Sequence, residues 1–393
     1  DEVALGAGQS TALQFEAAWP DAIYWSPQNP HLYTLQAELL DQGLPIDGTE
    51  TRFGFREVWL EGHKFYLNGV RVNLRGDAWH YQGFVQQNKE YALNWYRACK
   101  ETGINFVRLH AMPYPTFYLD AADEVGMLIV DESAIYGSSK STQSDHPRFI
   151  ENCRSHLRAL ARRDRNHPSV VIWSMQNEMR WVDGRDGYKT AIKELTKSIK
   201  ELDDTRPISY DGDNRLLEPA DMEIISMHYN IDGTIAGWQK DKPLIFGEHG
   251  KWHYIAPQVC ADLVGSGAYL SFESCMESIG LNERLFIEYA RREEVTGVTP
   301  FNMANYMVKA MPHTDIALTW PDLSGPGVKP NLIRRYSLTL NNGYVKDGPL
   351  FQPNSSWKHV QAAFKPATII PNEYDTAFFG GNDLRRSFSI YND

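Results

Sequence analysis

The stretch that decides the fold is His167-Pro168-Ser169-Val170-Val171-Ile172-Trp173-Ser174-Met175-Gln176-Asn177-Glu178. Residues 170–173 are β-branched or aromatic and form a run too short for a helix, which predicts a strand buried on both faces. Such a strand belongs to a parallel sheet covered by helices, and these sheets carry their functional groups at the carboxyl ends of the strands. The stretch therefore predicts that Asn177 and Glu178 lie at a functional edge.

A second apolar strand ends in the same way. Residues 243–250 read Pro-Leu-Ile-Phe-Gly-Glu-His-Gly, so Glu248 directly follows an apolar run. One glutamate after a strand is more often a helix cap or a solvated loop residue than a catalytic group, but two at two strand ends suggest a pair. Two carboxylates that face each other across roughly 5 Å form the arrangement of a retaining glycosidase. We expect Glu178 and Glu248 to face each other in this way.

Strand-like and helix-like segments alternate along the middle of the chain. The strand candidates are residues 71–75, 105–109, 127–132, 170–173, 207–211, 223–230, 243–246 and 297–302. Helical spacing is found at residues 91–102, 115–125, 147–165, 187–202 and 282–294. Eight strands that alternate with helices predict an α/β fold, the (β/α)8 or TIM barrel.

The two ends of the chain predict β structure. Residues 1–61 alternate apolar and polar side chains, as in residues 12–16, which is the period of half-buried antiparallel strands. Asn68-Gly69 within residues 65–70 predicts a tight hairpin turn. Three or four strands make only part of a β-sandwich. Residues 385–391 predict the first strand of another β domain, so we expect the chain to be a fragment of a longer gene product.

Composition excludes several classes of partner. Of the 393 residues, 42% are apolar and 23% are charged, as in an ordinary globular protein with a sizeable core. The formal net charge of −11 argues against nucleic acid as a partner. No apolar run reaches about 18 residues, so no membrane span is expected. The cysteines show no metal-ligand spacing and are interpreted as free thiols: Cys99, Cys153, Cys260 and Cys275. The sequence leaves the cellular compartment and homo-oligomerisation open.

The two glutamate motifs resemble those of glycoside hydrolase family 2, which includes β-galactosidases and β-glucuronidases. The segment from Ile172 to Glu178 is similar to the Asn-Glu acid/base motif after strand four, and the segment from Phe246 to Gly250 is similar to the nucleophile motif after strand seven. Residues 25–33, followed by Gly-Phe-Arg at 54–56, resemble the end of the immunoglobulin-like domain that precedes this barrel. The resemblance implies three parts. They are a partial immunoglobulin-like sandwich (1–61), a catalytic (β/α)8 barrel (62–345) and a C-terminal extension that leads to a further, truncated β domain (346–393).

The same resemblance implies residues that support the reaction. Arg108 matches the arginine of the family's Asn-x-Val-Arg motif and is expected to bond the nucleophile Glu248 and hold it ionised. Asn177, beside the acid/base Glu178, is expected to bond the sugar 2-hydroxyl. Tyr229 matches a tyrosine after strand six that bonds the nucleophile. A buried tyrosine with only a local partner is an alternative of equal weight.

Further substrate contacts are expected at Trp79, His80, Glu132, His228 and Trp320. His80 matches a histidine that contacts substrate hydroxyls, with a structural loop histidine as the alternative. Glu132 matches a magnesium ligand of the family's β-galactosidases, but Ala134 replaces the histidine that helps there. We therefore expect no metal or cofactor, and Glu132 then supports the site from behind or contacts substrate. His110 is displaced from the family's Ser-His-Tyr-Pro pattern, which leaves its role open.

The expected function is a retaining exo-β-glycosidase that removes terminal sugars from oligosaccharides. A neutral β-galactoside is the first expectation, because the closing loops give no convincing copy of the Asn-x-Lys motif that grips the carboxylate of glucuronides. β-Glucuronides, β-mannosides and galactan oligosaccharides stay open. Two other classes are a barrel that binds carbohydrate without hydrolysis and a metal-dependent hydrolase. The latter would need His-x-His near strand one, where the chain has Trp79-His80-Tyr81.

Overall fold

The computed structural model describes residues 3–79, 88–136, 146–179, 186–212, 221–229, 234–250, 256–301, 353–375 and 377–393. The main element is a sheet of eight parallel strands in the spatial order β10-β9-β8-β7-β6-β13-β12-β11. The two end strands, β10 and β11, are joined through side chains, since Ser226 Oγ donates to Asp211 Oδ1 at 2.8 Å. The sheet is therefore a nearly closed (β/α)8 barrel, which confirms the predicted fold class.

The barrel strands follow one another along the chain as β6 (Leu74–Trp79), β7 (Phe106–Leu109), β8 (Leu128–Glu132), β9 (Val170–Asn177), β10 (Ile208–Asp211), β11 (Ile225–His228), β12 (Leu244–His249) and β13 (Gly297–Pro300). The helices between or after them are α1 (Lys89–Thr102), α2 (Thr116–Val125), α3 (Pro147–Asp164), α4 (Asp186–Lys200), α5 (Thr234–Gly237), α6 (Pro257–Val264) and α7 (Phe272–Arg292), with a 3₁₀ turn at Gly265–Tyr269. None of the helices in these described ranges is long and apolar enough to cross a membrane.

Local sequence signals set several helix ends. The side chain of Asn88 accepts a hydrogen bond from the Tyr91 backbone and caps α1, and Gly103 ends this helix with a left-handed φ of 92°. Gly126 ends α2 in the same way with a φ of 75°. The prediction for the last helix was too short, because α7 begins at Phe272 behind the N-cap Ser271 and not at residue 282.

The inward face of the barrel changes from apolar to charged toward the carboxyl ends of the strands. Phe106 fills the lower interior, and Gly76 leaves room for its ring, since a Cβ on Gly76 would lie 2.3 Å from it. Two residues further along β7, Arg108 occupies the same inward face. In β8 the inward series runs from Leu128 to Glu132. The alternation therefore stacks a polar site on an apolar floor.

A small antiparallel sheet covers the apolar floor. It consists of β3 (Val58–Glu61), β4 (Lys64–Leu67) and β5 (Val70–Val72), and β4 contributes buried apolar side chains to the interior cluster. The predicted Asn68-Gly69 turn joins β4 and β5, with φ values of 51° and 82°. The predicted first barrel strand, residues 71–75, was wrong in its bounds. It spans the end of β5 and the start of β6, with a break at Asn73.

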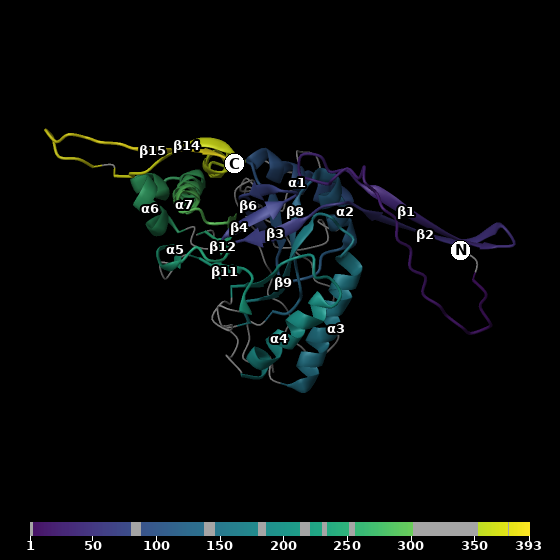
Figure 1. Cartoon of the computed structure of the whole chain (residues 1–393). Coiled ribbons are helices and arrows are strands. Elements are labelled where there is room, and N and C mark those ends of the chain that lie inside the picture. The colour runs from purple at the N-terminus through teal and green to yellow at the C-terminus, as the bar shows by residue number, and fades with distance from the viewer. Residues whose placement is uncertain are drawn as a thin grey trace, which may run out of the picture.

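The N-terminal hairpin consists of β1 (Tyr33–Asp41) and β2 (Leu44–Phe53), which extends away from the barrel (Figure 1). Its pairing agrees with the predicted antiparallel strands, but most of its residues are exposed and not half-buried. Residues 12–16, expected as a strand, form none. Five alternating residues are too few to predict a strand by themselves, because a strand also needs neighbouring strands with which to pair.

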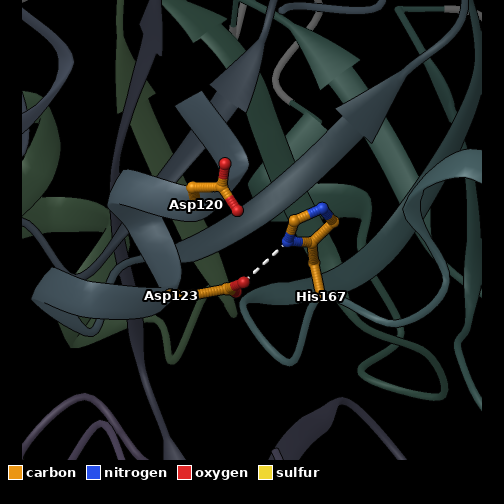
Figure 2. A group of neighbouring side chains, drawn as sticks. All are labelled: Asp120, Asp123 and His167. Carbon is orange, nitrogen blue, oxygen red and sulfur yellow. Dashed lines mark hydrogen bonds and ion pairs between the residues drawn. The ribbon is translucent and has the colours of Figure 1, made fainter. Parts of the chain in front are cut away.

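The amino end of the barrel is tied together around α2. Asp123 accepts a hydrogen bond at 2.6 Å from His167 in the turn before β9 (Figure 2). Its second oxygen accepts from the Ser169 backbone at 3.0 Å. Trp25 of the N-terminal segment donates from its indole to the Asp123 carbonyl. These bonds fix the start of β9, the strand that carries Asn177 and Glu178 at its other end.

The C-terminal segment packs against the same end of the barrel. It contains α9 (Trp357–Ala363) and a hairpin of β14 (Ala367–Pro371) and β15 (Phe388–Asn392). The strand predicted at 385–391 is present as β15, and it pairs with β14 as the second strand of this hairpin. The carboxylate of Asp393 is held by Arg75 at 3.0 Å and by Arg291 at 2.8 Å.

Candidate active site

The carboxyl ends of the barrel strands bring the two predicted glutamates together. Glu248 lies within β12 and is 6% exposed, and Glu178 directly follows β9. His228, the last residue of β11, lies between them, with Nδ1 2.7 Å from Glu178 Oε1 and 3.6 Å from Glu248 Oε2. One oxygen of each carboxylate and one His228 nitrogen all lie within 4.8 Å of one another. The nearest oxygens of the two carboxylates are therefore closer together than the roughly 6.5–9.5 Å that separates the two carboxyl groups of an inverting enzyme.

Backbone strain gathers at this edge of the barrel. Left-handed φ values are uncommon in residues with a side chain, yet Ala111, Glu178 and Tyr229 have φ values of 57°, 50° and 58°. Each of them lies just beyond a barrel strand. The Glu178 backbone N–H donates to the Asp211 carbonyl at 3.0 Å, and that of Tyr229 donates to the Glu248 carbonyl at 2.9 Å. Strain of this kind persists where surrounding contacts fix it, and it is typical of functional sites.

Arg108 is the hub of the polar network. Its guanidinium is 1% exposed and bonds Glu132 with two nitrogens at 2.8 and 2.9 Å, while Nη1 donates to Glu248 Oε1 at 3.0 Å. Its Nη2 also donates to Asn177 Oδ1 at 2.5 Å. Burial alone would lower the pKa of Arg108, but the carboxylates of Asp211, Glu132 and Glu248 hold it above its ordinary value. Arg108 thus stays charged beside the predicted nucleophile.

Glu132 lies behind this arginine. It is fully buried, and besides Arg108 it accepts from Ser174 Oγ at 2.7 Å and from the Ala111 backbone at 2.5 Å. Burial raises the pKa of Glu132 to about 7, although Arg108 works in the opposite direction. Both oxygens are occupied by protein donors, so the geometry favours support of the site over contact with a substrate.

Asp211 was not assigned a role from the sequence. It ends β10, is 2% exposed, lies 3.2 Å from Arg108 Nε, and accepts from Ser174 and Ser226 at 2.8 Å each. Gly247 allows this position, because a Cβ there would lie 2.0 Å from Asp211 Oδ1. Burial would raise the pKa of Asp211, but Arg108 and His228 hold it well below its ordinary value. The alternation of polar Ser209 and Asp211 in a short buried strand was the available signal.

His110 contacts the nucleophile candidate despite its displaced position in the sequence. Its Nε2 lies 3.1 Å from Glu248 Oε1, and its ring packs edge-on against Phe301 at 5.2 Å. Burial would raise the pKa of Glu248, but His228, His110 and Arg108 hold it well below its ordinary value. Three basic side chains thus favour an ionised Glu248.

Of the other predicted substrate contacts, some lie at the carboxyl end of the barrel and some fall outside the described residues. Asn177 is 1% exposed and faces Arg108, and the Tyr229 ring lies 6.3 Å from that of His249. The side chain of His228 is 4% exposed and faces the carboxylates, so the structure places it between the catalytic candidates. His80, Trp320 and the side chain of Trp79 lie outside the described residues.

Two groups of side chains in the described ranges have the donor types of a metal site. They are Glu178–His228–Glu248 and, at the amino end, Asp120–Asp123–His167 (Figure 2). In each group one carboxylate is already paired with an arginine, since Arg108 bonds Glu248 and Arg52 bonds Asp120 at 2.6 Å. The donors suit a divalent cation, but their charge is already balanced in part.

Comparison with protein families identifies the chain. The model described as "Glycosyl hydrolases family 2, TIM barrel domain" matches residues 55–254, and the model described as "Glycosyl hydrolases family 2" matches residues 2–56. The chain belongs to glycosyl hydrolase family 2. The first match contains the polar network at the carboxyl ends of the strands, from Arg108 to Glu248, and its end lies just beyond Glu248.

Individual relatives of this family 2 chain carry two kinds of name. A β-glucuronidase of Paenibacillus borealis is 31% identical over 220 residues, which are 53% of this chain and 36% of the relative. A β-galactosidase of Lactococcus lactis is 29% identical over 196 residues, 48% of this chain and 19% of the relative. The chain thus spans about a fifth to about a third of the length of these curated relatives.

A solved structure supports the fold. The family 2 β-galacturonidase from Eisenbergiella tayi, bound to galacturonate, superimposes with a TM-score of 0.61 at 21% identity. The match covers 89% of this chain and 61% of that one. At this identity the likeness concerns the fold alone.

Proposed function

We propose that this chain carries the catalytic barrel of a retaining exo-β-glycosidase, with Glu248 as nucleophile and Glu178 as acid/base. The observation that carries the proposal is the approach of the two carboxylates within 4.8 Å at the carboxyl end of the barrel. Retaining enzymes hold the pair at about 5–5.5 Å, because the nucleophile must reach the anomeric carbon directly.

The proposed reaction has two displacements. Glu248 attacks the anomeric carbon while Glu178 gives a proton to the glycosidic oxygen, so the C–O bond breaks and a glycosyl ester forms. Water then attacks the same carbon, Glu178 takes the water proton, and Glu248 leaves as a carboxylate. Arg108 and His110 prepare the first step, since both favour the charged form of Glu248. In this proposal Asn177 bonds the sugar 2-hydroxyl.

The sugar is proposed as a neutral β-galactoside first. No Asn-x-Lys triplet occurs in these 393 residues, and that motif grips the carboxylate of glucuronides in the resembling family. A β-glucuronide is the second candidate, supported by the name of the Paenibacillus relative. A panel of nitrophenyl β-galactoside, β-glucuronide and β-mannoside separates these choices through the released nitrophenol.

Trapping the ester tests the mechanism directly. A 2-deoxy-2-fluoro glycosyl fluoride of the preferred sugar should label the peptide that contains Glu248, as measured by mass spectrometry. The Glu248→Gln variant should stay unlabelled. Labelling of a different peptide would contradict the assignment. Sugar binding without label or turnover would favour the non-catalytic barrel, and loss of turnover with a chelator would favour a metal-dependent hydrolase.

A further inference from the structure

His228 lies at the centre of an unusual group of charges. Its side chain is 4% exposed and faces carboxylates from three strand ends, namely Glu178 at 2.7 Å, Glu248 at 3.6 Å and Asp211 at 3.9 Å. The guanidinium of Arg108 acts on His228 in the opposite sense, because its positive charge disfavours a protonated imidazole. A single imidazole thus connects the proposed acid/base to the proposed nucleophile.

The backbone leaves space for this contact. Gly212 follows Asp211 and has a φ of 72°. A Cβ on Gly212 would lie 2.8 Å from His228 Nδ1 and 3.1 Å from Glu178 Cγ. The first value is shorter than side-chain contacts allow and the second is tighter than most of them, so a larger residue at this position would force His228 or Glu178 to shift. The close approach therefore depends on a glycine that also adopts a left-handed conformation.

We propose that His228 stores the proton that Glu178 delivers to the leaving group, and thereby couples the charge of Glu178 to that of Glu248. The inference rests on the proposed function and deepens it. His228 acts through Glu178 and is a positioning residue, since its buried ring need not touch the sugar.

The proton balance closes over one turnover. Before reaction, His228 is an imidazolium between two carboxylates. Its Nδ1 proton moves to Glu178, which passes it to the glycosidic oxygen as that C–O bond breaks and Glu248 forms its ester bond. His228 is then neutral and Glu178 is a carboxylate. In the second step the water proton returns through Glu178 to Nδ1, and the released Glu248 regains its charge.

The electrostatics favour release of the proton at the right moment. Burial alone would lower the pKa of His228, but Glu248, Asp211 and Glu178 raise it to about 9. The charge of Glu248 is the largest of these raising influences, and ester formation removes it. The imidazolium therefore becomes more acidic as the nucleophile loses its charge.

Histidine titration followed by NMR tests this coupling without any need for turnover. In the wild-type chain the His228 ring should remain protonated until about pH 9. In Glu248→Gln its midpoint should fall by about one pH unit or more, because the neutral amide imitates the ester. A His228 ring that is neutral at pH 7 in the wild type, or an unchanged midpoint in the variant, would overturn the proposal.

Kinetics of His228→Asn provide a second test. Asparagine can still donate a hydrogen bond near the Nδ1 position, but it cannot release a proton. For an alkyl glycoside, whose leaving group needs the acid, kcat/KM should fall about 10²-fold, whereas an activated nitrophenyl glycoside should lose less than about 5-fold. The alkaline limb of kcat/KM should move toward lower pH by about one unit or more, since the proton must then reside on Glu178 alone.

His167→Asn is the matched control, because it changes a histidine that also bonds a carboxylate but lies at the opposite end of the barrel. It should leave the leaving-group dependence and the alkaline limb unchanged. Equal losses with both leaving groups in His228→Asn, or an unmoved alkaline limb, would remove the proton store while leaving the glycosidase proposal intact. A wild-type chain that hydrolyses no glycoside would remove both.

Discussion

The two ends of the barrel each contain a short histidine–carboxylate contact, and their surroundings differ. At the amino end, His167 lies 2.6 Å from Asp123 (Figure 2), and the other oxygen of this aspartate accepts the Ser169 backbone N–H. At the carboxyl end, His228 lies 2.7 Å from Glu178 but also faces Glu248 and Asp211. The bond lengths alone would not distinguish a structural pair from a functional one.

The difference lies in the balance of charges and in the backbone. The amino-end pair fixes a turn with one donor for each acceptor oxygen. At the carboxyl end, four carboxylates lie around Arg108 and two histidines, and one of them, Glu178, adopts a left-handed φ of 50°. Such an arrangement costs stability and is retained where function needs it. Variants at the two ends should therefore fail in different ways.

The largest effect is expected at Glu248. Glu248→Gln should lower turnover of a nitrophenyl glycoside by about 10⁴-fold or more, because the amide cannot form the glycosyl ester. Circular dichroism should show an unchanged fold, since glutamine preserves the shape of the side chain. Turnover within about tenfold of the wild type would exclude Glu248 as the nucleophile.

Arg108→Met should produce the largest loss of stability. It would leave the buried carboxylates of Glu132, Asp211 and Glu248 without their common cation, and removal of one partner from a buried ion pair costs about 3–5 kcal/mol. Urea unfolding measures this directly. Arg108→Lys should recover only part of the loss, because an ammonium cannot reproduce the two parallel bonds to Glu132. Wild-type stability in Arg108→Met would mean that the carboxylates are neutral in the folded protein.

The sequence carried enough information for the barrel and for the convergence of its two glutamates. Apolar runs of strand length that alternate with helical patterns are compatible with few folds other than a parallel sheet covered by helices. In such a barrel the carboxyl ends of all strands lie at the same face, so residues that follow two strands converge there. The need of Arg108 for a carboxylate partner also followed from sequence, because a buried arginine near a strand end requires one. The resemblance to family 2 implied that this partner is Glu248, and the structure shows the contact.

Asp211 and His110 show what the sequence did not reveal. A single aspartate at the end of a short strand is common, and only the missing side chain of Gly247 lets Asp211 approach Arg108 and Ser226. His110 reaches Glu248 where Ala111 turns the chain with a φ of 57°. An alanine in the left-handed region cannot be recognised from sequence, because tertiary contacts impose this conformation. The sequence therefore could not show where the preceding residue, His110, would point.

The pH dependence of stability should distinguish the two ends. His228 has a folded-state pKa of about 9, above its ordinary value near 6.5, so its contribution is complete below about pH 6.5 and is lost as pH rises through about 9. Asp203, near the amino end, has a pKa lowered to about 2, mainly by Arg206 against the effect of burial. Its contribution is present above about pH 4 and is lost as pH falls through about 2.

Urea midpoints of the wild type and His228→Asn, measured from pH 6 to pH 10, check the alkaline half of this prediction. The stability difference between the two proteins should shrink by about 3 kcal/mol over that range as the wild-type imidazolium loses its proton. A constant difference would mean that His228 does not titrate there in the folded protein. The Asp203→Asn variant should lose less stability than the wild type between pH 4 and pH 2, because it has no carboxylate at this position to protonate.

The smallest effect is expected at His167. His167→Asn should lower the free energy of unfolding by about 1–2 kcal/mol, because it weakens one partly buried bond to Asp123 while the Ser169 backbone still satisfies the other oxygen. The folded His167→Asn variant should keep the wild-type rate of glycoside hydrolysis and its pH profile, since the full length of β9 separates His167 from Glu178. Thermal unfolding and a pH–rate curve measure both quantities on one sample. A changed pH–rate curve would mean that the turn before β9 sets the position of Glu178, and the contrast between a structural and a functional histidine would then fail.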